Sequence, residues 1–144
     1  MNHTIKQEFF YQHAPQLVWE YITDAEKIAS WLMPNNFKAE PGYEFTFQTT
    51  PMPNFGFDGT IYCKVLELIP FEKLVYSWKG GPSKGVVTLD TVVTWTLEAK
   101  DNGTLLSLEH RGFTEQQAFT FQIMTKGWQD NLAELNGLIK PAVQ

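Results

Sequence analysis

Two hydrophobic patterns divide this chain into regions of different secondary structure. From Tyr43 to about His110, apolar and polar residues alternate over short stretches, which is typical of half-buried strands. From roughly Glu115 to Ile139 the apolar residues instead recur at helical spacing, which predicts one long amphipathic helix. The pattern therefore predicts a sheet followed by a helix that covers its concave face.

The predicted long helix has a clear start and one unusual interior residue. Thr114 is placed as its N-cap, with Gln117 at the spacing of a capping box. Gly127 lies in the interior, where glycine costs about 1 kcal/mol relative to alanine. Either a strand or a ligand approaches the helix closely there, or the glycine is simply tolerated. The apolar face consists of Phe121, Met124, Trp128, Leu132, Leu135 and Ile139.

Shorter elements are predicted before the sheet. Residues 5–11 read as a first strand, and Pro15 suits the first turn of a short helix that ends at about Ile22. Thr23 and Glu26 have capping-box spacing, which predicts a second short helix that ends at about residue 32. The apolar positions of these helices are Val18, Trp19, Ile22, Ile28 and Trp31 or Leu32.

Turn and loop residues separate the later strands. Asp101-Asn102-Gly103 predicts a hairpin turn, and the segments 51–56 and 80–85 are rich in proline or glycine. The predicted strands cover 43–48, 58–69, 74–79, 88–99 and the residues around 106–110. Antiparallel strands joined by hairpins, with helices on one face, define an α+β domain.

Length, composition and charge narrow the class of protein. A chain of 144 residues suffices for a single domain over 1–144, and a hydrophobic fraction of 43% excludes disorder. The net charge of −5, without a basic patch, argues against nucleic acid or an anionic membrane as partner. No apolar run is long enough to span a bilayer, and the start lacks a signal-peptide core, so we expect a cytoplasmic protein.

Metal and redox chemistry are not expected. Cys63 is the one cysteine, so neither an internal disulfide nor a thiolate metal site can form. His3 and His13 have no carboxylate pattern nearby that would complete a metal site. The sequence therefore predicts no cofactor and no metal.

Several short segments, taken together, resemble a known family. Their order and spacing are similar to those of the activator of heat-shock-protein-90 ATPase homologue family, which belongs to the START-like (SRPBCC) superfamily. The matching segments are Ala14–Trp19, Thr23–Ile28, Trp31, Pro41–Phe45, Gly59-Thr60, Pro70–Trp78, Val93–Leu97, Gly103-Thr104, His110–Phe113 and Gly127-Trp128. The resemblance implies a helix-grip fold: an antiparallel sheet wrapped around a long C-terminal helix, two short helices after the first strand, and a hydrophobic cavity between sheet and helix.

The strand registers predict which side chains face that cavity. A pocket of apolar side chains with a few polar groups is typical of small-molecule sites, although the same aromatic residues could form a solid core. His110 is the weak candidate for an acid or base, and a hydrogen-bonded core histidine is the alternative. The predicted ligand-binding residues are Trp31, Tyr43, Phe45, Phe47, Tyr76, Trp78, Trp95, Leu108, His110, Phe121, Met124, Trp128 and Leu132.

Three functions remain open at this point. The first is binding of a small, largely hydrophobic molecule in the cavity, without a cofactor. The second is a protein-interaction module; the family's namesake is a two-domain co-chaperone, and this chain resembles its C-terminal domain alone. The third is an enzyme of cyclase or hydrolase type that uses His110 and inward tyrosines. We expect loops 51–56 and 80–85 to gate the opening.

Overall fold

The helices and strands follow the chain in the predicted order. The computed structural model describes residues 3–139, so the outermost residues of the predicted domain lie outside it. The elements are β1 (His3–Tyr11), α1 (Pro15–Thr23), α2 (Ala25–Trp31), β2 (Glu44–Gln48), the 3-10 turn η1 (Pro53–Phe55), β3 (Thr60–Ile69), β4 (Lys73–Gly80), β5 (Leu89–Lys100), β6 (Gly103–Phe113), the 3-10 turn η2 (Glu115–Gln117) and α3 (Ala118–Leu138).

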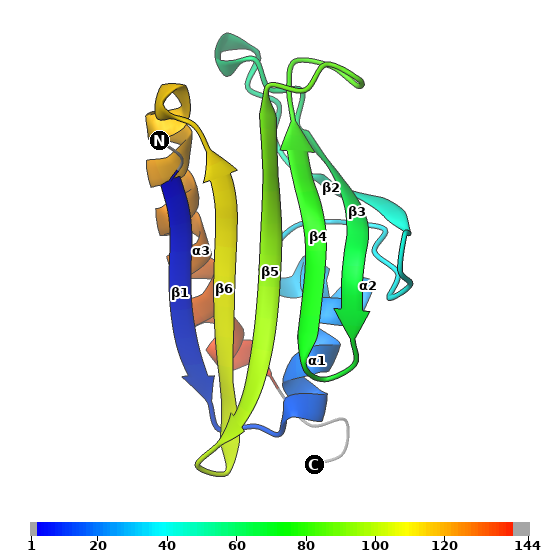
Figure 1. Cartoon of the computed structure of the whole chain (residues 1–144), viewed down its shortest axis with the longest axis vertical. Coiled ribbons are helices and arrows are strands. Elements are labelled where there is room, and N and C mark those ends of the chain that lie inside the picture. Colours follow the sequence, from blue (N-terminus) through cyan, green and yellow to red (C-terminus); the bar gives the residue numbers. More distant parts are fainter. Residues whose placement is uncertain (1–2, 140–144) are drawn as a thin grey trace.

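Over residues 3–139 the strands form one six-stranded sheet in the order β1-β6-β5-β4-β3-β2. Every neighbouring pair is antiparallel. Figure 1 shows that all three α-helices lie on one side of the sheet, with α3 running behind β1 and β6. This arrangement confirms the predicted α+β class and the helix-grip fold.

Two of the predicted chain reversals and caps are confirmed. Asp101 and Asn102 have positive φ values of 48° and 64°, as the tight hairpin between β5 and β6 requires. Thr114 and Gln117 form the predicted capping box, in which the Thr114 N–H donates to Gln117 Oε1 at 2.9 Å. The first turn after Thr114 is η2 rather than α-helix, so the predicted long helix begins as a 3-10 turn.

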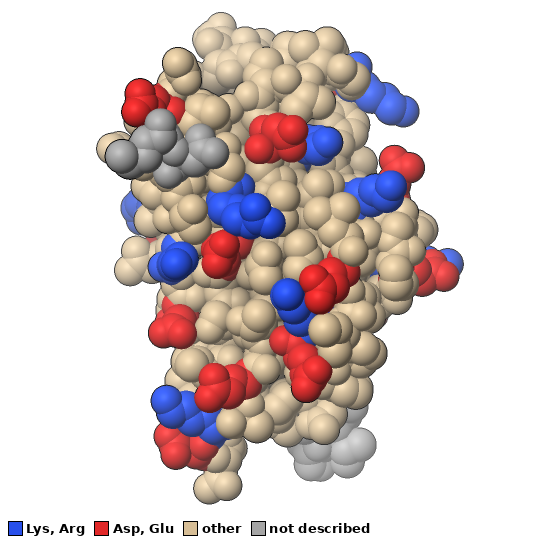
Figure 2. All heavy atoms as spheres, viewed as in Figure 1, with Lys and Arg blue, Asp and Glu red and all other residues tan. Residues whose placement is uncertain are grey.

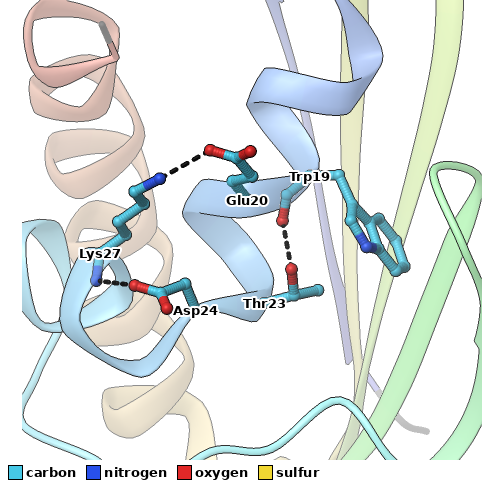
Figure 3. A network of polar contacts seen from close by, with 5 residues as sticks. All are labelled: Trp19, Glu20, Thr23, Asp24 and Lys27. Carbon is cyan, nitrogen blue, oxygen red and sulfur yellow. Dashed lines mark hydrogen bonds and ion pairs between the residues drawn. The ribbon is translucent and has the colours of Figure 1, made fainter. Parts of the chain in front are cut away.

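The predicted capping box of Thr23 and Glu26 is wrong. Thr23 is the last residue of α1, and its hydroxyl donates to the Trp19 carbonyl at 2.7 Å. Asp24 caps α2 instead, because its carboxylate accepts from the Lys27 N–H at 3.1 Å. A threonine bonded back into its own helix is not available to cap the next one. Figure 3 shows both bonds, together with the Lys27–Glu20 ion pair at 2.6 Å.

Aromatic side chains fill the centre of the space between sheet and helices. The Trp95 ring contacts Trp31 and Trp128, with centroids 6.1 and 5.4 Å apart. Phe45 contacts Phe37 at 4.9 Å and Tyr76 at 5.2 Å in edge-to-face geometry. Such rings interlock with few voids. The middle of the fold is therefore a solid core.

Charges of both signs are interspersed over the outer face of the sheet, as Figure 2 shows. Some form exposed pairs across neighbouring strands, such as Lys73 with Glu67 at 3.3 Å and Lys79 with Asp90 at 3.9 Å. Exposed pairs of this kind contribute little to stability. Among residues 3–139, no helix combines the length and apolar character needed to cross a membrane.

Candidate functional site

The long helix packs against the sheet along its C-terminal half. Trp128, Leu132 and Leu135 are buried, and the Tyr11 hydroxyl donates to the Leu132 carbonyl at 2.8 Å, which joins β1 to α3. Toward its start the same helix is open to solvent, and Phe119 is 58% exposed. The predicted continuous apolar face therefore meets the core over only part of its length.

A cavity of about 850 Å³ occupies the end of the molecule where α3 begins. Figure 1 shows that the β2–β3 and β4–β5 loops reach the same end. None of the lining side chains carries a charge. They are Leu32, Met33, Thr49, Met52, Phe55, Gly56, Phe57, Ile61, Trp78, Gly80, Gly81, Thr88, Leu89, Thr114, Gln116, Gln117, Phe119, Thr120, Ile123, Met124, Gly127, Trp128 and Asn131.

The structure brings three of the predicted ligand-binding residues to this cavity, namely Trp78, Met124 and Trp128. Phe121 does not line it, and its ring packs on Phe113 with centroids 5.5 Å apart. The other predicted residues lie outside the lining, where most of them pack in the core. They are Trp31, Tyr43, Phe45, Phe47, Tyr76, Trp95, Leu108, His110 and Leu132.

The cavity rim contains apolar residues that the strand and helix patterns did not select. Phe55 of η1 and Phe119 of α3 are 67% and 58% exposed, and their rings stack with centroids 5.7 Å apart. This contact joins the β2–β3 loop to the helix. One feature of the sequence could have pointed to these two residues. Phe55 is a large apolar residue in a proline-rich loop, and Phe119 is one that lies outside the apolar face of the helix. Periodicity cannot recognise such positions, because a loop has no period and Phe119 lies off the periodic apolar face of the helix.

His110 lies behind the cavity wall in a chain of buried hydrogen bonds. An indole N–H can only donate, so the contact of 3.0 Å between Trp128 Nε1 and His110 Nδ1 places the histidine proton on Nε2. Nε2 then donates to Thr91 Oγ1 at 2.8 Å, and the Thr91 hydroxyl donates to the Trp78 carbonyl at 2.7 Å. Burial lowers the pKa of His110 to about 3. The imidazole is therefore neutral at physiological pH, with both nitrogens engaged.

Two glycines shape the cavity in different ways. A Cβ at Gly81 would lie 1.9 Å from the Val86 carbonyl oxygen, so the β4–β5 loop can close only on glycine. A Cβ at Gly127 would meet no atom within 4 Å, and this residue lines the cavity. The sequence-based alternative of a strand packed against Gly127 is therefore wrong.

The described residues offer neither a metal site nor a reactive cysteine. Residues 3–139 contain no set of three His, Cys, Asp or Glu side chains placed to hold a metal ion. Cys63 is buried in β3, and this burial raises the pKa of its thiol well above the usual value. A thiol in that environment is a poor nucleophile.

An antiparallel sheet that grips a long C-terminal helix and leaves a cavity at one end defines a helix-grip protein. Residues 12–140 match the model of the family described as activator of Hsp90 ATPase homolog 1-like protein. The chain belongs to this family, as its sequence motifs indicated. The search of curated proteins found no match.

Solved structures show the same fold. Protein MLL2253 from Mesorhizobium loti is 29% identical, with a TM-score of 0.84 over 94% of this chain and 96% of its own. Protein BH1534 from Bacillus halodurans is 27% identical, with a TM-score of 0.75 over 96% and 97%. The Aha1 dimer from Colwellia psychrerythraea is 16% identical, with a TM-score of 0.77 over 99% of each chain. The last likeness concerns the fold alone.

Proposed function

We propose that the protein binds a small, largely hydrophobic and uncharged molecule in the cavity at the start of α3. The observation that carries this proposal is the cavity itself, about 850 Å³ in volume and lined without charges. Ordinary small-molecule sites enclose roughly 300–1,000 Å³ and have mainly apolar walls with a few polar groups. A charged ligand would lose its hydration there without gaining a counter-ion.

The two loops at the cavity rim control access in this proposal. Phe55 and Phe119 stack across the rim and join η1 to α3, so separating the two rings would widen the entrance. Gly81 and Thr88 of the β4–β5 loop also line the cavity. These are the segments whose proline and glycine content predicted a gate.

A protein-interaction module is a second candidate, supported by one observation. Several large apolar side chains are exposed in the two rim loops and at the start of α3, where a partner could cover them. They are Met52, Phe55, Val86, Val87, Phe119 and Ile123. The described residues offer no comparable support for an enzyme, because both nitrogens of His110 are engaged and no second ionisable group bonds to it.

Blocking the cavity tests the proposed function. The probe is N-phenyl-1-naphthylamine, a neutral dye whose fluorescence rises in apolar sites. A leucine at Gly127 would project into the cavity, so Gly127→Leu should weaken dye binding at least about tenfold, a loss of about 1.4 kcal/mol. Fluorescence titration measures the dissociation constants.

Gly137→Leu is the matched control. Gly137 also lies in α3, and a Cβ there would meet no atom within 4 Å, but this residue is exposed and does not line the cavity. This variant should bind the dye as the original protein does. Equal binding by both variants would contradict the proposed site. Native mass spectrometry of protein from its own host would then seek the natural ligand.

A further inference from the structure

Trp78 differs from the other deeply buried tryptophans in the state of its indole N–H. The Trp78 side chain is 1% exposed, and its Nε1 has no hydrogen-bond acceptor among the described residues. The three other tryptophans that are exposed by 4% or less all have indole acceptors. These pairs are Trp31 with the Tyr21 carbonyl at 2.8 Å, Trp95 with the Tyr76 hydroxyl at 2.9 Å, and Trp128 with His110 Nδ1 at 3.0 Å.

An unpaired donor of this kind needs a physical explanation. A buried N–H without an acceptor has lost its hydrogen bond to water without gaining another, and native proteins keep few such groups. Trp78 lines the cavity, whereas Trp31 and Trp95, with paired N–H groups, do not. The unpaired indole is thus in the wall of the proposed ligand site.

The geometry points to Trp78 Nε1 as the hydrogen-bond donor to a neutral oxygen of the ligand, and we propose it as a specificity-determining group. This inference rests on the proposed function, because it concerns the same cavity. The ligand class is a mainly apolar molecule with a carbonyl, ether or hydroxyl oxygen. A carboxylate is disfavoured because no lining residue is a cation.

The surroundings of Trp78 hold the donor in place. Its ring packs against Phe47, His110 and Trp128, with centroid distances of 5.2, 5.3 and 5.3 Å. A ring packed in this way aims its N–H in one direction, which favours an oxygen at one position of the ligand. The N–H itself is buried, so a ligand oxygen reaches it when cavity side chains move aside. The flexible thioethers of the lining, Met33, Met52 and Met124, suit that adjustment.

Two probes of nearly equal shape test the inference. Benzophenone has a carbonyl where diphenylmethane has a methylene, and both are neutral and fit within the cavity volume. Their affinities are measured by displacement of N-phenyl-1-naphthylamine from the original protein and from Trp78→Phe. For each protein, the affinity for benzophenone is divided by the affinity for diphenylmethane. Comparing this ratio between the two proteins cancels the difference in hydration between the probes.

The ratio should fall about fivefold in Trp78→Phe, as expected for the loss of one hydrogen bond. Phe47→Leu is the control, because it changes a ring beside Trp78 and leaves the donor in place. This variant should keep the ratio of the original protein even where both affinities drop.

A second measurement uses the unaltered protein and does not depend on the folding of a variant. In protein with ¹⁵N-labelled tryptophan, benzophenone should move the assigned Trp78 indole proton downfield, and diphenylmethane should not. If both probes bind but neither the ratio nor this signal responds to the carbonyl, the inference about Trp78 is overturned and the proposed cavity stands. If neither probe displaces the dye from the original protein, the inference about Trp78 is likewise overturned.

Discussion

His110 shows how strongly surroundings can alter the chemistry of one residue. In water an imidazole titrates near neutral pH and suits acid–base catalysis. In this core the Trp128 N–H and the Thr91 hydroxyl occupy its two nitrogens, and burial opposes the charged form. The group thus connects α3 to β5 and β6. Its role in this structure is to join elements of the core.

The low pKa of His110 makes stability depend on pH. The pKa is about 3 in the folded protein and 6.5 for an ordinary histidine, so the unfolded chain binds the proton more readily. Stability contributed by the neutral imidazole is complete above pH 6.5 and is lost as the pH falls toward 3. From pH 7 to pH 5 the free energy of unfolding should drop by about 2 kcal/mol from this residue.

Urea denaturation at several pH values checks this expectation. His110→Gln should be less stable at pH 7 but should lose most of the decline between pH 7 and pH 5. His13→Gln, which leaves the buried network intact, should keep the decline of the original protein. A decline that persists unchanged in His110→Gln would show that other groups cause it.

At the scale of elements, the two halves of α3 have different surroundings. The C-terminal half presents Trp128, Leu132 and Leu135 to the core, and the N-terminal half forms a wall of the cavity. The short turn η1 is connected to that wall through the Phe55–Phe119 contact. A three-residue turn whose backbone bonds are all local is easier to displace than a strand inside a sheet.

This arrangement predicts that Phe55 controls the rate of ligand exchange. Removing the ring in Phe55→Ala should speed both association and dissociation of N-phenyl-1-naphthylamine severalfold, with a smaller change in the dissociation constant. The physical reason is that, in the proposed gate, the ligand passes the Phe55–Phe119 contact in either direction. Stopped-flow fluorescence measures the two rates.

Leu66→Ala is the control for this experiment. Leu66 is 51% exposed on β3 and does not line the cavity, so its truncation should leave both rates unchanged. A Phe55→Ala protein with the original rates would mean that the ligand enters elsewhere.

At the scale of the whole molecule, the sheet supports the two rim loops at one end. β4, β5 and β6 each have hydrogen-bonded strands on both sides, whereas the backbone bonds inside the rim loops are turn contacts, such as Met52 with Phe57 and Ser83 with Val86. Figure 1 places both loops beside the start of α3. The proposed binding site and both rim loops therefore lie at one end of the molecule, and the end of α2 reaches the same cavity through Leu32 and Met33.

Hydrogen exchange followed by mass spectrometry tests this division. Amides of residues 51–57 and 81–88 should exchange much faster than those of β4, β5 and β6. Saturating N-phenyl-1-naphthylamine should slow exchange in the two loops and leave the central strands unaffected. Loops as protected as the central strands would contradict the gating role.

Much of the fold was predictable from the sequence because its signals are local. Alternation along β2 and β4 placed Phe45, Phe47, Tyr76 and Trp78 on the inner face, and all four are buried. The hairpin at Asp101-Asn102 and the cap at Thr114 followed from short-range chemistry. The α2 cap was misassigned because Thr23 and Asp24 can both cap a helix, and the length of α1 decides between them.

The candidate site was predictable only in part. Trp78, Met124 and Trp128 line the cavity, but other inward residues such as Phe45 and Trp95 contact neighbouring rings instead. Periodicity identifies the face on which a side chain lies. It does not indicate whether another ring or open space lies opposite.

The sequence by itself determined the types, order and inner faces of the elements, because these depend on residues a few positions apart. The tertiary structure decided where the space remains and which donors find acceptors. Both depend on distances between segments far apart in the chain, such as η1 and α3 or β4 and α3. The cavity, the tautomer of His110 and the unpaired N–H of Trp78 therefore became visible only in the folded molecule.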